Sequence, residues 1–131
     1  MAAARLRALR THLLPLHQAI LDHERRQYER LHGKIGSPHT TLQLVLHDPF
    51  FAWVRPLASL IVQIDERLAA EAPIQPSEVD AFGEQTRALL QRDLAGGDFR
   101  EQYQRVLQSS TDVVIAHGQV LSMVPVQRTG N

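Results

Sequence analysis

Residues 47–68, HDPFFAWVRPLASLIVQIDERL, decide the fold that this sequence predicts. The stretch holds the only tryptophan of the chain, two of its four phenylalanines and its densest run of branched aliphatic residues. Its apolar residues recur at spacings of three and four, which is the pattern of a buried helix face. The members of this face are Phe50, Val54, Leu57, Ile61, Ile64 and Leu68. Phe51, Trp53, Leu60 and Val62 widen it, so we expect the central helix of a bundle here.

Prolines shape this predicted helix. Asp48 followed by Pro49 indicates a helix start, because the Asp side chain accepts bonds from first-turn N–H groups and Pro has no donor to satisfy there. Pro56 lies inside the pattern, where it removes one backbone bond, so we expect either a kink or a break. A break would leave a short helix from Asp48 to Arg55 and start the long helix at Pro56.

Both geometries create an aromatic corner, formed by His47, Phe50, Phe51, Trp53 and Arg55. An irregular, aromatic-rich corner of a small bundle can hold a ligand, and the Arg55 guanidinium can grip a carboxylate or phosphate through two parallel hydrogen bonds. These five residues are therefore a candidate ligand-binding site. The alternative is that the aromatic side chains only close one end of the core.

The first segment predicts a long amphipathic helix. Its apolar stripe again follows helical spacing and consists of Leu6, Leu9, Leu13, Leu16 and Ile20. Pro15 leaves two alternatives, a continuous helix with a kink or a separate short arm from Ala3 to Arg10. Gly33 is expected to end the helix, since glycine tolerates the left-handed cap conformation. Residues 1–3 are expected to fray.

Local start and stop signals divide the middle of the chain. Residues 37–38, Ser-Pro, predict the start of a short helix. Ser77 with Asp80 resembles a capping box at the start of a third long helix, which the glycines at 96–97 should end. Asp98 can cap the helix that follows.

A last helix is expected over Val113–Val124, recapped by the hydroxyl residues at 109–111. Gly118 lies inside it and costs up to about 1 kcal/mol relative to Ala. Such a cost indicates either the close approach of a neighbouring helix or a strand in this Val-rich segment, and we favour the helix. Residues 125–131 are expected to form a frayed tail.

Together these segments predict a single all-α domain over residues 1–131, a bundle of about four main helices plus short extra helical turns. A chain of this size can bury roughly two thirds of its unfolded surface without covalent links. The sequence has no cysteine, which excludes disulfides, thiolate metal sites and cysteine nucleophiles.

The charges cancel overall but not locally. Fourteen basic and fourteen acidic residues remove the electrostatic argument for binding nucleic acid or an anionic membrane. Through Lys34 there are seven basic and three acidic residues, whereas Asp65–Glu84 contains six acidic residues and only Arg67. This asymmetry favours either side-by-side packing of the two regions or a head-to-tail contact between copies of the chain.

No apolar run reaches the roughly eighteen residues of a membrane span. The Arg-containing start superficially resembles a transit peptide, but its apolar spacing continues into Tyr28 and Leu31. We therefore expect the first helix of the mature fold, no signal sequence, no membrane association and a bacterial cytoplasmic location.

Seven histidines invite a test for metal ligands. Only Glu29 and His32 have the Glu-x-x-His spacing used twice in di-iron bundles, and the second copy is missing, so we expect neither a metal nor another cofactor. His117 has only Val and Leu three and four residues away, and His17 and Glu24, seven residues apart, share a face of the first helix, so these three residues form a candidate buried polar cluster. If their helix faces meet, they could act as ligands or as an acid/base pair. The alternative is hydrogen-bonded core histidines.

Known catalytic and nucleotide-binding motifs are absent from the sequence: it has no phosphate loop, no nucleophile elbow and no dinucleotide glycine fingerprint. The run LHDPFFAWVRPLASLIVQIDE, residues 46–66, resembles a stretch of small all-helical bacterial proteins. It covers about a sixth of the chain and implies a helical bacterial domain, with no activity or site residue to carry over.

The function that we expect is therefore a non-enzymatic protein-interaction or regulatory module, with a protein partner or a second copy of itself as its target. A homodimer through the basic first helix or the aromatic corner is the form expected for self-association. The alternative is a helical bundle that binds a small ligand or cofactor, at the aromatic corner or at the His17, Glu24 and His117 cluster.

Overall fold

The structure is a computed structural model that describes residues 1–92 and 98–124. These ranges contain six α-helices, a 3-10 helix and a π-helical turn, and no strand. In chain order they are α1 (Ala2–His32), α2 (Pro38–His47), η1 (Pro49–Val54), α3 (Arg55–Ala69), α4 (Pro76–Arg87), η2 (Ala88–Arg92), α5 (Asp98–Ser109) and α6 (Thr111–Met123). The all-α prediction is confirmed, although the described part has six helices where about four main ones were expected.

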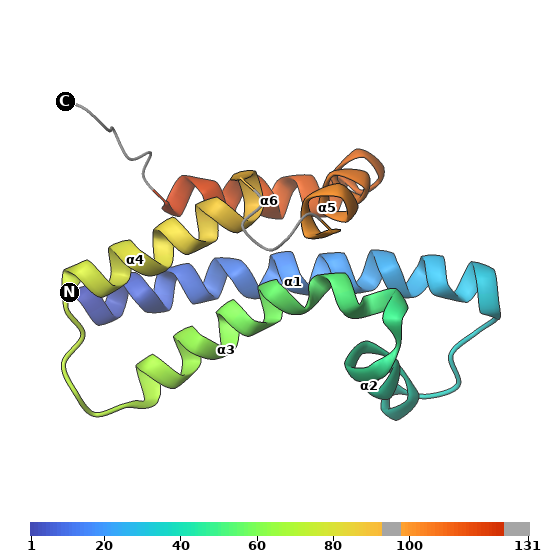
Figure 1. Cartoon of the computed structure of the whole chain (residues 1–131), viewed down its shortest axis with the longest axis horizontal. Helices are drawn as coiled ribbons and strands as arrows, with labels where there is room; N and C mark the ends of the chain where they lie inside the picture. The colour runs from blue at the N-terminus through green and yellow to red at the C-terminus, as the bar shows by residue number, and fades with distance from the viewer. Residues whose placement is uncertain (93–97, 125–131) are drawn as a thin grey trace.

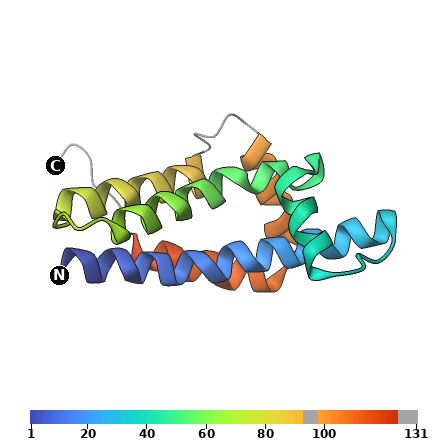
Figure 2. The ribbon, with the colours of Figure 1, turned by 90° about the horizontal axis from the view of Figure 1, so that it is seen from below.

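Helix α1 is the central helix of the molecule. It runs along the whole long axis in Figures 1 and 2, and α3, α4, α6 and η1 pack against it. Its predicted stripe is buried, with every member at most 4 % exposed: Leu6, Leu9, Leu13, Leu16 and Ile20. The central place predicted for the helix in residues 47–68 was therefore wrong. Helix α3 buries Leu57, Leu60, Ile61 and Ile64 and leaves Val62 52 % exposed, so it packs through one face and is not surrounded by other helices.

The start of α1 differs from the sequence prediction, whereas its end agrees with it. The helix begins at Ala2, which is buried, within the stretch expected to fray. It continues through Pro15 without a break, so no separate N-terminal arm forms. At the other end Gly33 has a φ of 87°, and its N–H donates to the Glu29 carbonyl at 2.8 Å. The predicted glycine stop is confirmed.

The chain breaks its α-helical geometry just before Pro56. The Asp48 carboxylate accepts from the Phe50 N–H at 2.8 Å, as predicted, but the helix that it caps is the 3-10 helix η1. Helix α3 then begins at Arg55, so Pro56 lies in its first turn, where a missing N–H leaves no acceptor unpaired. The break predicted as one of two alternatives is what forms, one residue earlier than expected.

Other local signals locate helix starts. The Ser37 hydroxyl accepts from the Thr40 N–H at 3.1 Å at the start of α2, and the Ser110 hydroxyl accepts from the Val113 N–H at 3.3 Å at the start of α6. Both predicted caps are confirmed. The glycines at 96–97 and the tail at 125–131, which were expected to end a helix and to fray, lie outside the described residues.

The predicted cap of α4 was wrong by two residues. The helix starts at Pro76, and the Gln75 N–H donates to Glu78 Oε2 at 2.7 Å, so this pair takes the place of Ser77 and Asp80. Arg67, at the end of α3, donates to both Glu78 oxygens, from Nε at 2.6 Å and from Nη2 at 3.1 Å. A guanidinium from another helix therefore fixes the carboxylate that caps this one.

Helix α6 spans Thr111–Met123 with Gly118 inside it, so the strand alternative does not form. The close approach that Gly118 suggested is also absent. A Cβ built on Gly118 would meet no atom within 4 Å. The glycine therefore lies on an open surface of a regular helix.

The uneven charges of the sequence are partly resolved by packing. Arg5 of α1 and Asp80 of α4 form an ion pair at 3.0 Å, and Arg10 of α1 pairs with Asp65 of α3. The side-by-side packing of the basic and acidic regions, one of the two predicted alternatives, therefore occurs for the first part of α1. The basic residues near the C-terminal end of α1 lie at the opposite end of the long axis from the acidic residues 65–84 (Figure 1).

Within residues 1–92 and 98–124, no individual helix combines the length and the apolar character that crossing a bilayer requires. Helix α2 and the segment Pro49–Ala69 meet those criteria only as a pair, which is bent by 72°.

Candidate functional site

Glu24 anchors the most elaborate polar cluster of the described residues. Its side chain lies on α1 and is only 1 % exposed. One carboxylate oxygen accepts from Arg105 Nη2 at 2.9 Å and lies 3.2 Å from His23 Nδ1, while the other accepts from Trp53 Nε1 at 3.4 Å. We call His23, Glu24, Trp53 and Arg105 the Glu24 cluster.

Three elements meet at the Glu24 cluster. Glu24 and His23 come from α1, Trp53 from η1 and Arg105 from α5. A buried carboxylate is costly unless a cation and hydrogen-bond donors compensate it, and here both are present. Because Glu24 is 1 % exposed and its oxygens contact three side chains, the cluster ties the elements together rather than offering a free acid or base.

A row of rings continues from Trp53 toward α6. The ring centroids of Trp53 and Phe99 are 5.5 Å apart, those of Phe99 and Tyr103 5.3 Å, and those of Tyr103 and His117 5.5 Å. The Tyr103 hydroxyl lies 2.7 Å from His117 Nδ1. Burial raises the pKa of the Tyr103 phenol and lowers the pKa of His117, so at neutral pH the phenol donates to a neutral imidazole.

The predicted cluster of His17, Glu24 and His117 is not brought together by hydrogen bonds. Glu24 has the partners given above, and His117 is bonded to Tyr103. His17 is partly buried, and burial lowers its pKa. No group of three or more His, Asp or Glu side chains in the described ranges is placed to hold a metal ion.

The aromatic corner is largely filled by its own side chains. Phe51 is 1 % and Trp53 6 % exposed, and Phe50 packs edge-on against Phe51 with ring centroids 5.2 Å apart. Arg55 is exposed, and its Nη2 donates to the Leu46 carbonyl at 2.9 Å. His47 is exposed at the end of α2. Phe50, Phe51 and Arg55 thus stay at the corner, whereas Trp53 points its N–H to Glu24.

His23 and Arg105 are site residues that sequence reasoning missed. A buried carboxylate such as Glu24 needs a cationic partner, so the sequence could have predicted that an arginine or lysine lies beside it. The chain offers thirteen arginines, however, and Arg105 lies 81 residues from Glu24. No local spacing could select it.

A polar hollow of about 430 Å³ lies beside the Glu24 cluster, where α1 faces the junction of α5 and α6. His23, Arg26, Gln27 and Arg30 form one wall, and residues 109–112 form the other. Neither Arg26 nor Arg30 pairs with a carboxylate in the part of the chain that the structure describes. We call this the His23 hollow.

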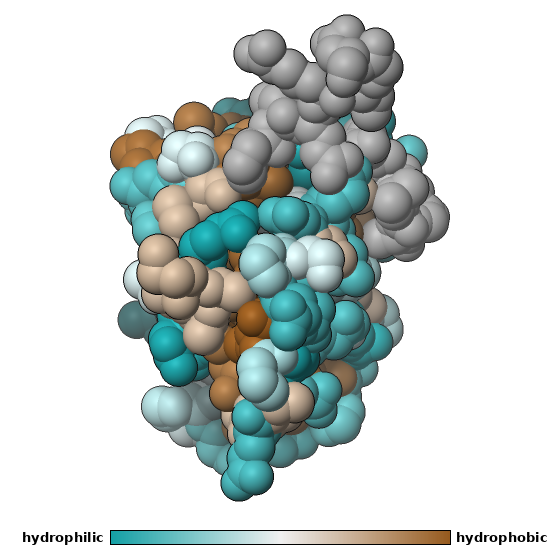
Figure 3. Space-filling model, turned by 90° about the vertical axis from the view of Figure 1, so that its left-hand side faces the viewer, coloured by the Kyte–Doolittle hydropathy of each residue, from teal (hydrophilic) through white to brown (hydrophobic). Residues whose placement is uncertain are grey.

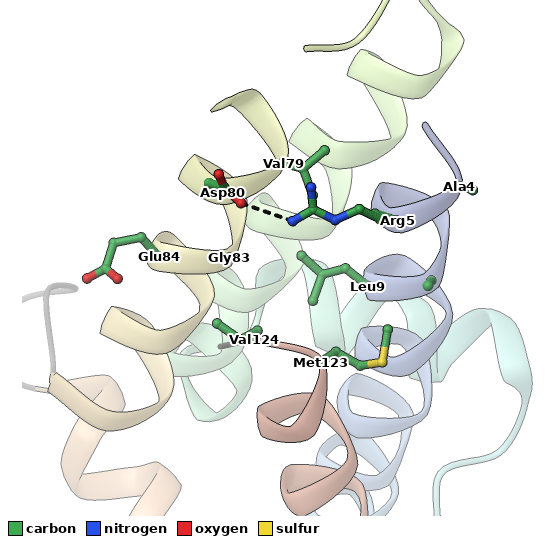
Figure 4. Close-up of a pocket in the computed structure, with 10 residues that line it drawn as sticks. Ala4, Arg5, Leu9, Val79, Asp80, Gly83, Glu84, Met123 and Val124 are labelled. Carbon is green, nitrogen blue, oxygen red and sulfur yellow. Dashed lines mark hydrogen bonds and ion pairs between the residues drawn. The ribbon is translucent and has the colours of Figure 1, made fainter. Parts of the chain in front are cut away.

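A second hollow, of about 360 Å³, lies between the first turns of α1, helix α4 and the end of α6. In Figure 4, Arg5 reaches from α1 to Asp80 on α4, and Leu9, Met123 and Val124 lie along the hollow. We call this the α1–α4 hollow. Figure 3 looks at the end of the molecule where α1 begins and shows apolar residues exposed between hydrophilic ones.

Helix α2 differs from every other described α-helix because none of its ten residues is buried. It contains no Asp, Glu, Lys or Arg. Leu42 and Leu46, one turn apart on the same helix face, are 53 % and 51 % exposed. We call this pair the α2 surface.

Comparison with known proteins gives no relative: no family model, curated protein or solved structure matches this chain. The surfaces, hollows and side-chain contacts described above are therefore the basis for inferring function.

Proposed function

We propose that this protein is a non-enzymatic interaction module that self-associates, and that the α2 surface forms the contact. The observation that carries the proposal is that α2 buries none of its residues while it exposes two leucines on one face. Amphipathic helices of folded domains normally turn their apolar face to the core. Exposed apolar side chains that gather into one patch mark interaction surfaces.

The energetics support a contact here. Burying one leucine side chain stabilises by about 1.5–3 kcal/mol, so burying Leu42 and Leu46 together offers a useful contact energy. Helix α2 is also too short to form stably in isolation. Its cap at Ser37 and its packing on η1 hold it in place without covering the leucines.

A second copy is the partner that the charges favour. The chain has no net charge, so two copies do not repel one another at long range. Its basic residues 25–34 and its acidic residues 65–84 lie at opposite ends of the long axis (Figure 1), so that copies attract each other end to end.

The test is the mass of the protein in solution, measured by light scattering from micromolar to near-millimolar concentration. The wild type should grow in mean mass, whereas Leu42→Glu should weaken association at least about tenfold, since one leucine burial is worth about a factor of ten. Gln43→Glu is the matched control, because it adds the same charge to α2 beside the leucine face. A wild type that stays monomeric throughout would refute the proposal.

A second candidate function is the binding of a small anionic ligand in the His23 hollow. It is supported by the two guanidiniums of Arg26 and Arg30, one helical turn apart on one wall, and by the buried imidazole of His23 beside them. Asp112 lines the same hollow, which leaves the arginines in excess by one. Titration calorimetry with inorganic phosphate should give saturable heat that Arg26→Ala removes and Arg100→Ala retains. Equal heats for all three proteins would rule this site out.

A further inference from the structure

We infer that the α2 surface of one copy docks into the α1–α4 hollow of a second copy, in a head-to-tail contact. The inference rests on the proposed function and names the surface that receives α2. It joins two features of the described chain: α2 lies toward one end of the long axis, and the first turns of α1, which line the hollow, lie at the other end (Figures 1 and 2).

The lining of the hollow suits an apolar helix face. Its walls are formed mainly by small and apolar residues: Ala4, Ala8, Leu9, Val79, Gly83 and Met123. The small side chains allow another helix to approach closely, and the volume of about 360 Å³ has the size of a binding pocket for compact apolar groups. A Cβ built on Gly83 would lie 3.6 Å from Val124 Cγ1, which is an ordinary van der Waals contact. The missing side chain therefore leaves room in the hollow, and the glycine is not required by strain.

The charges around the two surfaces favour this pairing over the pairing of α2 with its own copy. Arg55 bonds to the carbonyl of Leu46 at the end of α2 and pairs with no carboxylate in the described ranges, whereas Arg25, beside the start of α2, is paired with Glu29 at 3.7 Å. A two-fold contact between two α2 helices would bring Arg55 of each copy toward an arginine of the other copy. Like charges brought together at an interface cost free energy.

The receiving end carries a small excess of acidic residues, because residues 1–10 and 65–84 together hold six acidic and four basic side chains. Asp80 lines the α1–α4 hollow and is 60 % exposed, and residues 65–84 contain six acidic residues and one arginine. Arg5 pairs with Asp80 across the hollow, at 3.0 Å (Figure 4). An exposed pair of this kind contributes about 0–1 kcal/mol, so an arriving cation can exchange with Arg5 at little cost.

The test mixes two variants, each of which lacks one half of the contact. Leu42→Glu with Leu46→Glu removes the α2 surface. Ala4→Arg covers the hollow, because Ala4 is exposed in the first turn of α1 and a long cationic side chain there lies over the opening. Ala81→Arg, at an exposed position of α4 that does not line the hollow, is the control for the added charge. Circular dichroism melts check that each variant is folded.

Native mass spectrometry then reads the result, since the variants differ in mass. Each blocked variant alone should show at least a tenfold loss of self-association, Ala81→Arg should assemble like the wild type, and the 1:1 mixture should form a heterodimer. If Ala4→Arg assembles like the wild type, or the mixture yields no heterodimer, the docking inference is overturned while self-association through α2 stands. If the wild type itself does not associate, both proposals fall.

Discussion

Arg105 on α5 donates a hydrogen bond of 2.9 Å to Glu24 on α1, across 81 residues of sequence. The two ends of this bond differ in exposure, since the Glu24 side chain is 1 % and the Arg105 side chain 44 % exposed. The guanidinium therefore extends from the surface to neutralise a carboxylate in the core. Helix α5 is attached to α1 by this bond and by the aromatic row that begins at Trp53.

Replacing Arg105 by Met should lower the free energy of unfolding by about 2 kcal/mol. Among the described residues Arg105 is the one arginine or lysine that pairs with Glu24, so its loss leaves a buried charge under-compensated, which costs about 3–5 kcal/mol when both partners are buried. Because Arg105 is partly exposed, water can replace part of its interaction with Glu24, so the expected loss is smaller. Urea denaturation measures the difference. Arg100→Met on the exposed side of α5 is the control and should change stability by less than about 0.5 kcal/mol.

Removing the carboxylate should relieve that penalty. Glu24→Gln in the Arg105→Met background should be no less stable than Arg105→Met alone, because the buried charge is gone. A double mutant that is less stable by the sum of both single losses would show that the two side chains do not act on each other.

The free energy of unfolding should fall as the pH is lowered from 7.5 toward 5. Burial lowers the pKa of both His17 and His117 from the usual 6.5, so below that pH the unfolded chain binds protons that the folded chain does not. Stability is therefore fully present above pH 6.5 and declines as pH drops toward the lowered pKa values. His17→Gln with His117→Gln should flatten this part of the profile, measured by urea denaturation at half-unit pH steps. An unchanged slope would mean that these histidines are not responsible.

Gly118→Ala should stabilise the protein by about 0.5–1 kcal/mol. The residue lies inside α6, and an added Cβ meets no atom within 4 Å, so only the gain in helix propensity remains. Gly33→Ala is the matched contrast, because its φ of 87° strains any side chain, and it should destabilise. Thermal melts that shift in the same direction for both would contradict this explanation.

Glu78→Gln should lower the melting temperature at neutral pH but have little effect at pH 2. Hydrogen bonds from Arg67 and then from the Gln75 N–H lower the pKa of Glu78 from 4.5 to about 2. Its contribution is thus present above pH 4.5 and is lost as the pH falls through about 2. Differential scanning calorimetry at both pH values measures the gap between variant and wild type. A gap of equal size at both would assign the effect to packing instead.

The features that sequence reasoning predicted well are local. The stripe from Leu6 to Ile20, the caps at Ser37 and Ser110 and the stop at Gly33 each depend on residues within one or two turns. Local geometry alone satisfies these backbone groups, so a single sequence carries the information.

The features that it missed depend on distant partners. Gln75 with Glu78 caps α4 because Arg67 of another helix holds the carboxylate, and the Ser77 signal had no such support. Glu24 and His117 likewise bond to side chains of α5, Glu24 to Arg105 and His117 to Tyr103, and no local spacing indicates either partner. The central position predicted for residues 47–68 was inferred from their number of apolar side chains. That number does not say which helices pack around them, and the structure has α1 in the central position.

Helix α1 packs along α6, so a helix that is synthesised before the other described helices depends on the last of them. Until α6 emerges, the buried stripe of α1 from Leu6 to Ile20 has only part of its final cover. Synthesis therefore includes a long interval in which a leucine-rich helix remains open to chaperones. Changes that slow translation in the α5–α6 region should prolong that interval and lower the yield of folded protein without altering the finished molecule.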